Sequence, residues 1–200
     1  MTFNQNISAH ICPCCTLCTL MSLTAPKQYA TEAAVPAGRM PRVLGTVEVD
    51  APAAVWWCGV HGGAGESTLE RIFRGSRASD HRWPIVRLGD PIPAVVLAAR
   101  TDARGLRAVQ RAMREHLESA LPVDVVGLVL MADAPGRLPR VLRDLARVVG
   151  GTVPRVWSLP WVEAWRAGEV PSPANSPKEA DRLAAELRVA LGLDQKGRMA

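Results

Sequence analysis

Residues 55–69 read VWWCGVHGGAGESTL, and this stretch decides the predicted fold. The mostly apolar run over 53–60 is typical of a strand that is buried on both faces. Glycines at 62, 63 and 65 then let backbone N–H groups converge on an anion without obstruction by Cβ atoms. A helix predicted from Ser67 to about Phe73 would add the positive end of its dipole. The stretch therefore predicts a phosphate-binding loop between a strand and a helix.

Apolar runs and helical periodicities alternate through the rest of the chain. The predicted strands are a short one at 42–49 and buried ones at 93–100, 123–132 and 155–160. The predicted helices cover 104–117, 138–149, 161–168 and a last segment ending near Leu191. Residues 75–93 are rich in Gly, Pro and Asp, which predicts a loop with at most a short strand at 85–88. The alternation predicts an α/β fold with a mostly parallel sheet and helices on both faces.

The helix predictions rest on particular residues. One apolar face is predicted for Leu106, Val109, Met113 and Leu117, and another for Leu138, Val141, Leu142, Leu145 and Val149. The segment Ser176-Pro177-Lys178-Glu179 predicts a capping box at the start of the last helix. In a sheet of this kind ligands bind beyond the carboxyl ends of the strands, which is where the glycine loop lies.

Size and composition predict one globular domain over 41–192. Residues 1–40 include Cys12, Cys14, Cys15 and Cys18, and are expected to be disordered or an artefactual extension, with translation starting at Met21 or Met40. Residues 193–200 are expected to be frayed. No run approaches 18 consecutive apolar residues, so no membrane span is expected. Neither a secretory signal nor a disulfide framework is indicated, which favours a cytoplasmic location.

The sequence HGGAGEST at 61–68 resembles the deviant Walker A motif of the ParA/MinD-like ATPases, whose pattern is K-G-G-x-G-K-T/S-T. In that comparison His61 takes the place of the signature lysine, and Glu66 takes the place of the phosphate-binding lysine. The matching positions are Gly62, Gly63, Gly65, Ser67 and Thr68, with Ala64 at the variable position. The resemblance implies a P-loop NTPase-like domain, Mg-ATP as cofactor, Ser67 as a Mg²⁺ ligand and a homodimer around ATP.

The resemblance extends over 53–192, more by the order of elements than by motif. The segment VWSLPWVEAWRAGE is similar to the family's closing strand and short helix, which would place Pro160 and Trp161 beside the base. The acidic Walker B position has no counterpart at 75–92 other than Asp90, and Asp133 is an alternative. The whole chain also resembles an uncharacterised family of high-GC Gram-positive bacteria and their mobile elements.

Glu66 opposes the chemistry that the loop implies. A lysine about 4 Å from a phosphate charge contributes on the order of 4 kcal/mol at an effective dielectric near 20, and a carboxylate would repel by a similar amount. The helix dipole returns only about 1 kcal/mol. The sequence therefore predicts a degenerate, non-catalytic site. Three alternatives stay open: nucleotide binding without fast hydrolysis, rescue of Glu66 by Arg71, Arg87 or Arg100, and a glycine turn needed only for packing.

Arginine accounts for 21 of the 24 basic residues, and eight arginines form two stripes. These are Arg104, Arg107, Arg111 and Arg114, and then Arg137, Arg140, Arg143 and Arg147. Each stripe lies opposite an apolar helix face. If the two helices share a side of the sheet, the stripes would merge into a basic surface that suits DNA phosphates or an acidic partner. His81 and His116 lack partners at the spacing of a metal site or a catalytic triad.

Three functions are compatible with these observations. The first is a pseudo-ATPase with a binding or regulatory role and an unidentified protein partner, in plasmid or mobile-element maintenance. The second is an ATPase that dimerises around ATP. The third is non-specific binding to the DNA backbone.

Overall fold

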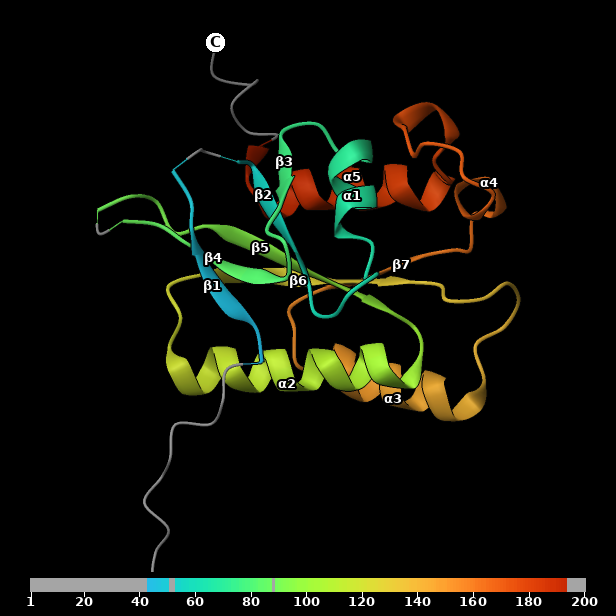
Figure 1. Ribbon diagram of the computed structural model, residues 1–200, viewed down its shortest axis with the longest axis horizontal. Helices are drawn as coiled ribbons and strands as arrows, with labels where there is room; N and C mark the ends of the chain where they lie inside the picture. Colours follow the sequence, from blue (N-terminus) through green and yellow to red (C-terminus); the bar gives the residue numbers. More distant parts are fainter. Residues whose placement is uncertain (1–42, 51–52, 88, 194–200) are drawn as a thin grey trace, which may run out of the picture. The chain divides into compact units, whose positions relative to one another are not determined.

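The computed structural model describes residues 43–50, 53–87 and 89–193 (Figure 1). The predictions for residues 1–40 and 194–200 lie outside these ranges. The main sheet has five parallel strands in the order β3-β2-β5-β6-β7. Their bounds are β2 Val55–Gly59, β3 Ser76–Ala78, β5 Ala94–Arg100, β6 Asp124–Met131 and β7 Val156–Leu159. The predicted α/β class with a parallel sheet is confirmed.

Helices cover both faces of this sheet (Figure 1). One face carries α2 (Ala103–Ser119) and α3 (Arg140–Gly150), which pack against each other. The other carries α1 (Glu66–Ile72) and α5 (Lys178–Ala190). The short α4 (Glu163–Arg166) and the 3-10 helix Pro173–Asn175 lie between β7 and α5. Among the described residues, no helix is both long and apolar enough to cross a membrane.

Two apolar cores explain why the central strands are apolar from end to end. Along β5, Val95, Leu97 and Ala99 face the core under α2, and Val96 and Ala98 face the core under α1 and α5. All five of these residues are fully buried. A strand with cores on both faces needs apolar residues at every position, so its sequence shows a continuous run in place of alternation.

The order of the strands creates a switch point at the end of β2. From β2 the chain passes through α1 to β3 on one side, and then crosses to β5 on the other side of β2. Connections that leave in opposite directions open a crevice between the carboxyl ends of the two strands concerned. The loop 60–65 and Arg100, the last residue of β5, both lie at this crevice.

The prediction of a loop over 75–93 is wrong. Two strands lie there: β3, and β4 (Arg82–Ile85), which pairs in parallel with β1 (Gly45–Glu48) in a separate two-stranded sheet. The strand β4 was not predicted because it contains Pro84, which has no N–H to donate. A strand in a two-stranded sheet has one unpaired edge and tolerates this missing donor. Trp83 is fully buried and stacks on His116, with ring centroids 5.6 Å apart, which anchors β4.

Two details of the helix predictions are also corrected. Leu117 and Val141 were expected in the apolar faces, but their side chains are 71% and 77% exposed. Leu117 lies in the last turn of α2, and Val141 lies on the flank of α3, next to Leu142, which packs against the core. The last helix begins after Pro177 without a side-chain cap, and the capping box lies earlier, between Ser172 and Asn175.

Candidate anion-binding site

The loop at the switch point needs its glycines. Gly63 and Gly65 have φ angles of 79° and 101°, in the left-handed region that side chains other than glycine rarely adopt. A Cβ atom at Gly65 would also collide with the side chain of Met131. The N–H of Ala64 donates to the carbonyl of His61 at 3.1 Å and closes the turn. Within the described residues, the N–H groups of Gly62, Gly63 and Gly65 have no hydrogen-bond acceptor.

Glu66 begins α1, but its carboxylate is turned into the protein. It is buried, and its Oε2 accepts the N–H of Gly59 at 2.6 Å. Its Oε1 accepts the N–H of His81 at 3.1 Å and lies 3.2 Å from His81 Nδ1. The carboxylate therefore connects the end of β2 to the turn between β3 and β4. The side chain that contacts the Glu66 carboxylate is that of His81, and not one of the arginines predicted to neutralise it.

The turn at His81 is built around this carboxylate. Asp80 and His81 both have positive φ angles, 57° and 56°, and His81 Nδ1 also lies 3.0 Å from the carbonyl of Gly59. A Cβ atom at position 59 would lie 2.6 Å from His81 Nδ1 and 3.0 Å from Glu66 Oε2. His81 was missed because its partner is fifteen residues away in sequence. The available signal was Gly59, since a glycine ending an apolar strand indicates a close approach.

Arg100 fastens the loop from the neighbouring strand. Its Nε donates to the carbonyl of Gly63 at 2.9 Å, and its Nη1 donates to the carbonyl of Ala132 at 3.1 Å. Its backbone N–H donates to Nε2 of His61 at 3.1 Å, and His61 Nδ1 lies 2.9 Å from the carbonyl of Gly62. Since Nε2 accepts, the hydrogen of the ring is on Nδ1 and His61 is neutral in this arrangement.

Gly105 makes room for this contact. A Cβ atom at Gly105 would lie 2.9 Å from His61 Nε2 and would collide with the carbonyl of Arg100. This glycine in the first turn of α2 was not predicted as part of the site. His61 is therefore tied to β5 and α2 of its own chain.

A pocket of about 300 Å³ opens beside the loop. Three arginines line it from three elements: Arg71 from α1, Arg100 from β5 and Arg166 from α4. Glu169 is the single acidic residue in its described lining. The lining also brings together Thr68, Pro160 and Trp161, and the guanidinium of Arg166 lies 4.7 Å from the centre of the Trp161 ring.

The charge of this pocket is not balanced. Burial lowers the pKa of Arg100, and the nearby charge of Arg166 lowers it further. Arginine nevertheless stays charged in proteins, so the two guanidinium groups repel each other, and the nearby carboxylates of Asp133 and Asp102 act on Arg100 in the opposite sense. An anion between them would relieve this repulsion, and a planar guanidinium is suited to binding phosphate or carboxylate through two hydrogen bonds.

The residues present fit the anionic part of a nucleotide but do not supply a magnesium site. Ser67 is exposed at the start of α1 and does not line the pocket. Mg²⁺ prefers carboxylate oxygens, and those of Glu66 are already occupied by N–H donors from Gly59 and His81. Over the described ranges, no group of three His, Cys, Asp or Glu residues could hold a metal ion.

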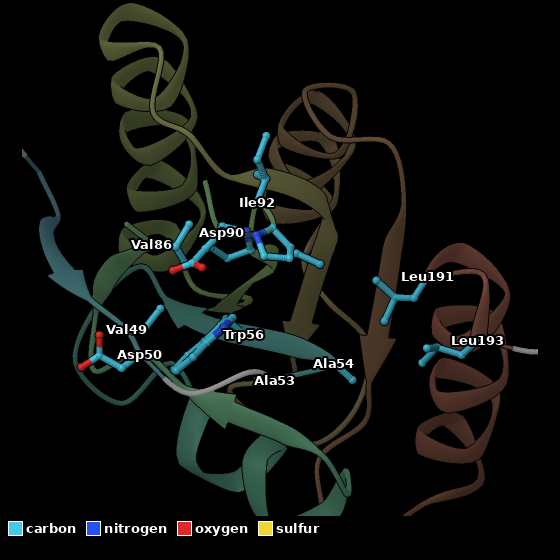
Figure 2. Close-up of a pocket in the computed structure, with 13 residues that line it drawn as sticks. Val49, Asp50, Ala53, Ala54, Trp56, Val86, Asp90, Ile92, Leu191 and Leu193 are labelled. Carbon is cyan, nitrogen blue, oxygen red and sulfur yellow. The ribbon is translucent and has the colours of Figure 1, made fainter. Parts of the chain in front are cut away.

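The two candidates for a Walker B acid lie elsewhere. Asp133 is exposed after β6, and its N–H donates to Thr101 Oγ1 at 3.1 Å. Asp90 lines an apolar pocket of about 410 Å³ at the opposite end of the strands, where β2 and β5 begin. Figure 2 shows Asp90 in that pocket with Trp56 and Ile92. The third arginine proposed for rescue, Arg87, is ion-paired with Glu48 at 2.7 Å and Asp50 at 3.6 Å.

Comparison of the sequence with protein families gives one assignment. Residues 53–182 match a family of unknown function, DUF6668, and the chain belongs to this family. The matched segment includes the loop, Arg100, α2, α3 and the Trp161–Arg166 segment. No curated protein and no solved structure matches the chain.

Proposed function

We propose that this protein is a degenerate P-loop NTPase-like protein that binds an anionic, phosphate-bearing ligand and does not hydrolyse it. Its role is then one of binding or regulation. The observation that carries the proposal is the convergence of Arg71, Arg100 and Arg166 on one pocket beside the glycine loop. Among the described residues that line this pocket, positive charge exceeds negative charge by two units, since Glu169 is the single acid among them.

The three arginines of the pocket supply the positive charge that the loop lacks without its lysine. Each guanidinium about 4 Å from a phosphate charge contributes on the order of 4 kcal/mol at an effective dielectric near 20, before desolvation is subtracted. The carboxylate of Glu66 is turned toward β2, where it accepts the N–H groups of Gly59 and His81, so its repulsion of an anion in the pocket is weaker than the sequence alone implies. Binding of phosphate is therefore supported although the lysine is absent.

Hydrolysis is not supported in the same way. Phosphoryl transfer needs a metal ion across the phosphates and a residue that positions the attacking water. The carboxylate of Glu66 already accepts the N–H of Gly59, and Asp133 lies at the surface. Asp90 lies at the opposite end of the strands, where β2 and β5 begin. The role in plasmid or mobile-element maintenance, the protein partner and the homodimer rest on the sequence resemblance and stay predictions.

Calorimetric titration of the full chain tests the proposal. The ligands are pyrophosphate, Mg-ATP, Mg-GTP and the two diphosphates, and hydrolysis is followed as phosphate release. We expect binding of at least one of these ligands with no turnover. Arg100→Gln combined with Arg166→Gln should weaken binding by more than tenfold, because two charge-assisted contacts to the anion are lost.

The matched control carries the same change of charge away from the pocket. Arg182→Gln combined with Arg188→Gln changes two exposed arginines on α5 and should leave the affinity within about twofold. Mg²⁺-dependent turnover that disappears in Ser67→Ala would overturn the non-catalytic assignment. Failure of wild-type protein to bind any of these ligands would overturn the anion site itself.

A further inference from the structure

The two arginine stripes predicted from sequence are both exposed. Seven of the eight residues lie on α2 and α3, and Arg137 lies in the turn before α3. We call the surface formed by these residues the arginine face. Its members are Arg104, Arg107, Arg111, Arg114, Arg137, Arg140, Arg143 and Arg147.

The arginine face points away from the sheet on both helices. Leu106, Val109 and Met113 of α2 contact the core, and so do Leu142 and Leu145 of α3. At 100° per residue, the arginines of each helix are centred on the side opposite these apolar residues. Helices α2 and α3 pack against each other on one face of the sheet (Figure 1), so the two rows of arginines are carried by adjoining helices.

Most of the charge on this face is uncompensated. Exposed acidic residues on the two helices are Glu118 and Asp144. Asp144 pairs with Arg147 at 3.0 Å and with Arg140 at 3.8 Å. Glu115 is buried, where it accepts the N–H groups of Val43 and Leu44. The six other arginines make no ion pair with any residue in the described part of the chain.

We infer that the arginine face binds the phosphate backbone of duplex nucleic acid. From Arg104 to Arg114 a helix rises about 15 Å, and one strand carries roughly four to five phosphates over that length of the duplex axis. The axes of packed helices lie about 8–10 Å apart, which sets the scale of the separation between the two rows. Each row thus offers about one guanidinium per phosphate, and the fork geometry of arginine suits phosphate oxygens.

The composition of the face favours a duplex over its two main competitors. Single strands are held by aromatic side chains on which bases stack, and neither α2 nor α3 contains Phe, Trp or Tyr. The core of a protein interface is depleted of charged residues and holds apolar anchors. Here the exposed Val141 and Val148 lie on the flank of α3, outside the rows of arginines.

The inference is independent of the proposed anion site, because the arginine face covers helices and the pocket lies at the strand ends. Fluorescence anisotropy with a labelled 30-base-pair duplex tests it, using the full chain at several salt concentrations without added nucleotide. With about five phosphate contacts, the logarithm of the binding constant should fall against the logarithm of salt with a slope of about −4 to −5. Two duplexes of unrelated sequence should bind alike.

The decisive variant is Arg107→Glu combined with Arg143→Glu, one unpaired arginine from each row. At 0.1 M salt each lost contact weakens binding roughly eightfold, so this variant should bind more than fiftyfold more weakly with a shallower salt slope. The control is Arg182→Glu combined with Arg188→Glu on α5, which makes the same change of net charge on the opposite face of the sheet. It should change the affinity by less than threefold.

Three results would overturn the inference. They are equal loss of affinity in both variants, equal binding of a single strand, and competition by poly-glutamate as strong as by unlabelled duplex at equal charge. The last result would assign the face to an acidic protein partner. Circular dichroism of both variants separates a loss of binding from a loss of folding.

Discussion

At the residue scale, the side chain of Glu66 has a structural role as a hydrogen-bond acceptor. The sequence places it where a phosphate-binding lysine is expected, but its carboxylate accepts N–H groups from Gly59 and His81 within the protein. An acceptor in this position satisfies two backbone N–H groups, and it adds to the other hydrogen bonds between β2 and this turn, such as that from the Ser79 N–H to the Trp57 carbonyl. Glu66 is therefore part of the support beneath the loop, and a lysine there would place a donor against two donors.

The replacement Glu66→Lys tests this structural role. It should lower the free energy of unfolding by about 3 kcal/mol, because two N–H groups lose their acceptor and an ammonium group is placed at a buried position. Urea denaturation measures the change. Glu70→Lys is the control, since Glu70 is exposed on the same helix and the change of charge is identical. It should shift stability by less than about 0.5 kcal/mol. Equal stability of the two variants would contradict the assignment.

Gly59 allows a second test at this scale. Gly59→Ala would bring a Cβ atom within 2.6 Å of His81 Nδ1 and should destabilise the protein by about 1–3 kcal/mol through overpacking. Gly62→Ala is matched to it, because nothing lies within 4 Å of that position and its φ is not in the left-handed region. Chemical denaturation should show little change for Gly62→Ala. A neutral Gly59→Ala would mean that His81 and Glu66 move apart easily.

Residues such as these set the limit of prediction from sequence. The motif at 61–68 identified the loop, since glycine spacing is a local property. The partners of the motif were missed, because His81 and Gly105 reach it from other elements. Only tertiary structure joins Glu66 to a histidine in a left-handed turn, or gives the neutral ring of His61 an N–H donor from β5.

At the scale of elements, long segments with strong periodicity were predictable and short ones were not. Strands β5 and β6 are continuous apolar runs, and α2 repeats its apolar residues every three or four positions. β3 has three residues and β4 contains a proline, so their pairing with β2 and β1 is stabilised by tertiary contacts such as those of Trp83. Local sequence carries little information about such strands.

The start of α2 can be tested as an element boundary. Asp102 is its N-cap, and the side chain accepts the N–H of Gly105. Asp102→Ala removes this acceptor from the orphan N–H groups of the first turn and should lower stability by about 1 kcal/mol. Asp102→Asn keeps an acceptor and should remain close to wild type. Thermal denaturation followed at 222 nm distinguishes them, and equal losses in both variants would attribute the effect to charge and not to capping.

At the scale of the whole molecule, the two cores meet at the central strands. Cys58 of β2 lies fully buried in the core under α2, and its thiol is directed at the carbonyl of Arg82 at 3.3 Å. Burial raises the pKa of this thiol from its ordinary value of 9.0 to about 12. Folding thus keeps a proton on Cys58 that the unfolded chain releases at lower pH, which couples the stability of the fold to alkaline pH.

The sign of this coupling follows from proton counts. Below pH 9 the thiol is protonated in both states and contributes no pH dependence. Between pH 9 and about 12 the unfolded state has lost the proton while the native state retains it, so stability falls as pH rises. The slope approaches about 1.4 kcal/mol per pH unit once the unfolded thiol is fully ionised.

Urea denaturation of wild type and Cys58→Ala at pH 8, 9.5 and 10.5 isolates this contribution, since other groups titrate alike in both proteins. Wild type should lose stability faster than Cys58→Ala above pH 9, whatever their difference at pH 8. Parallel curves would show that water reaches the thiol, and hence that the core beneath α2 opens without global unfolding.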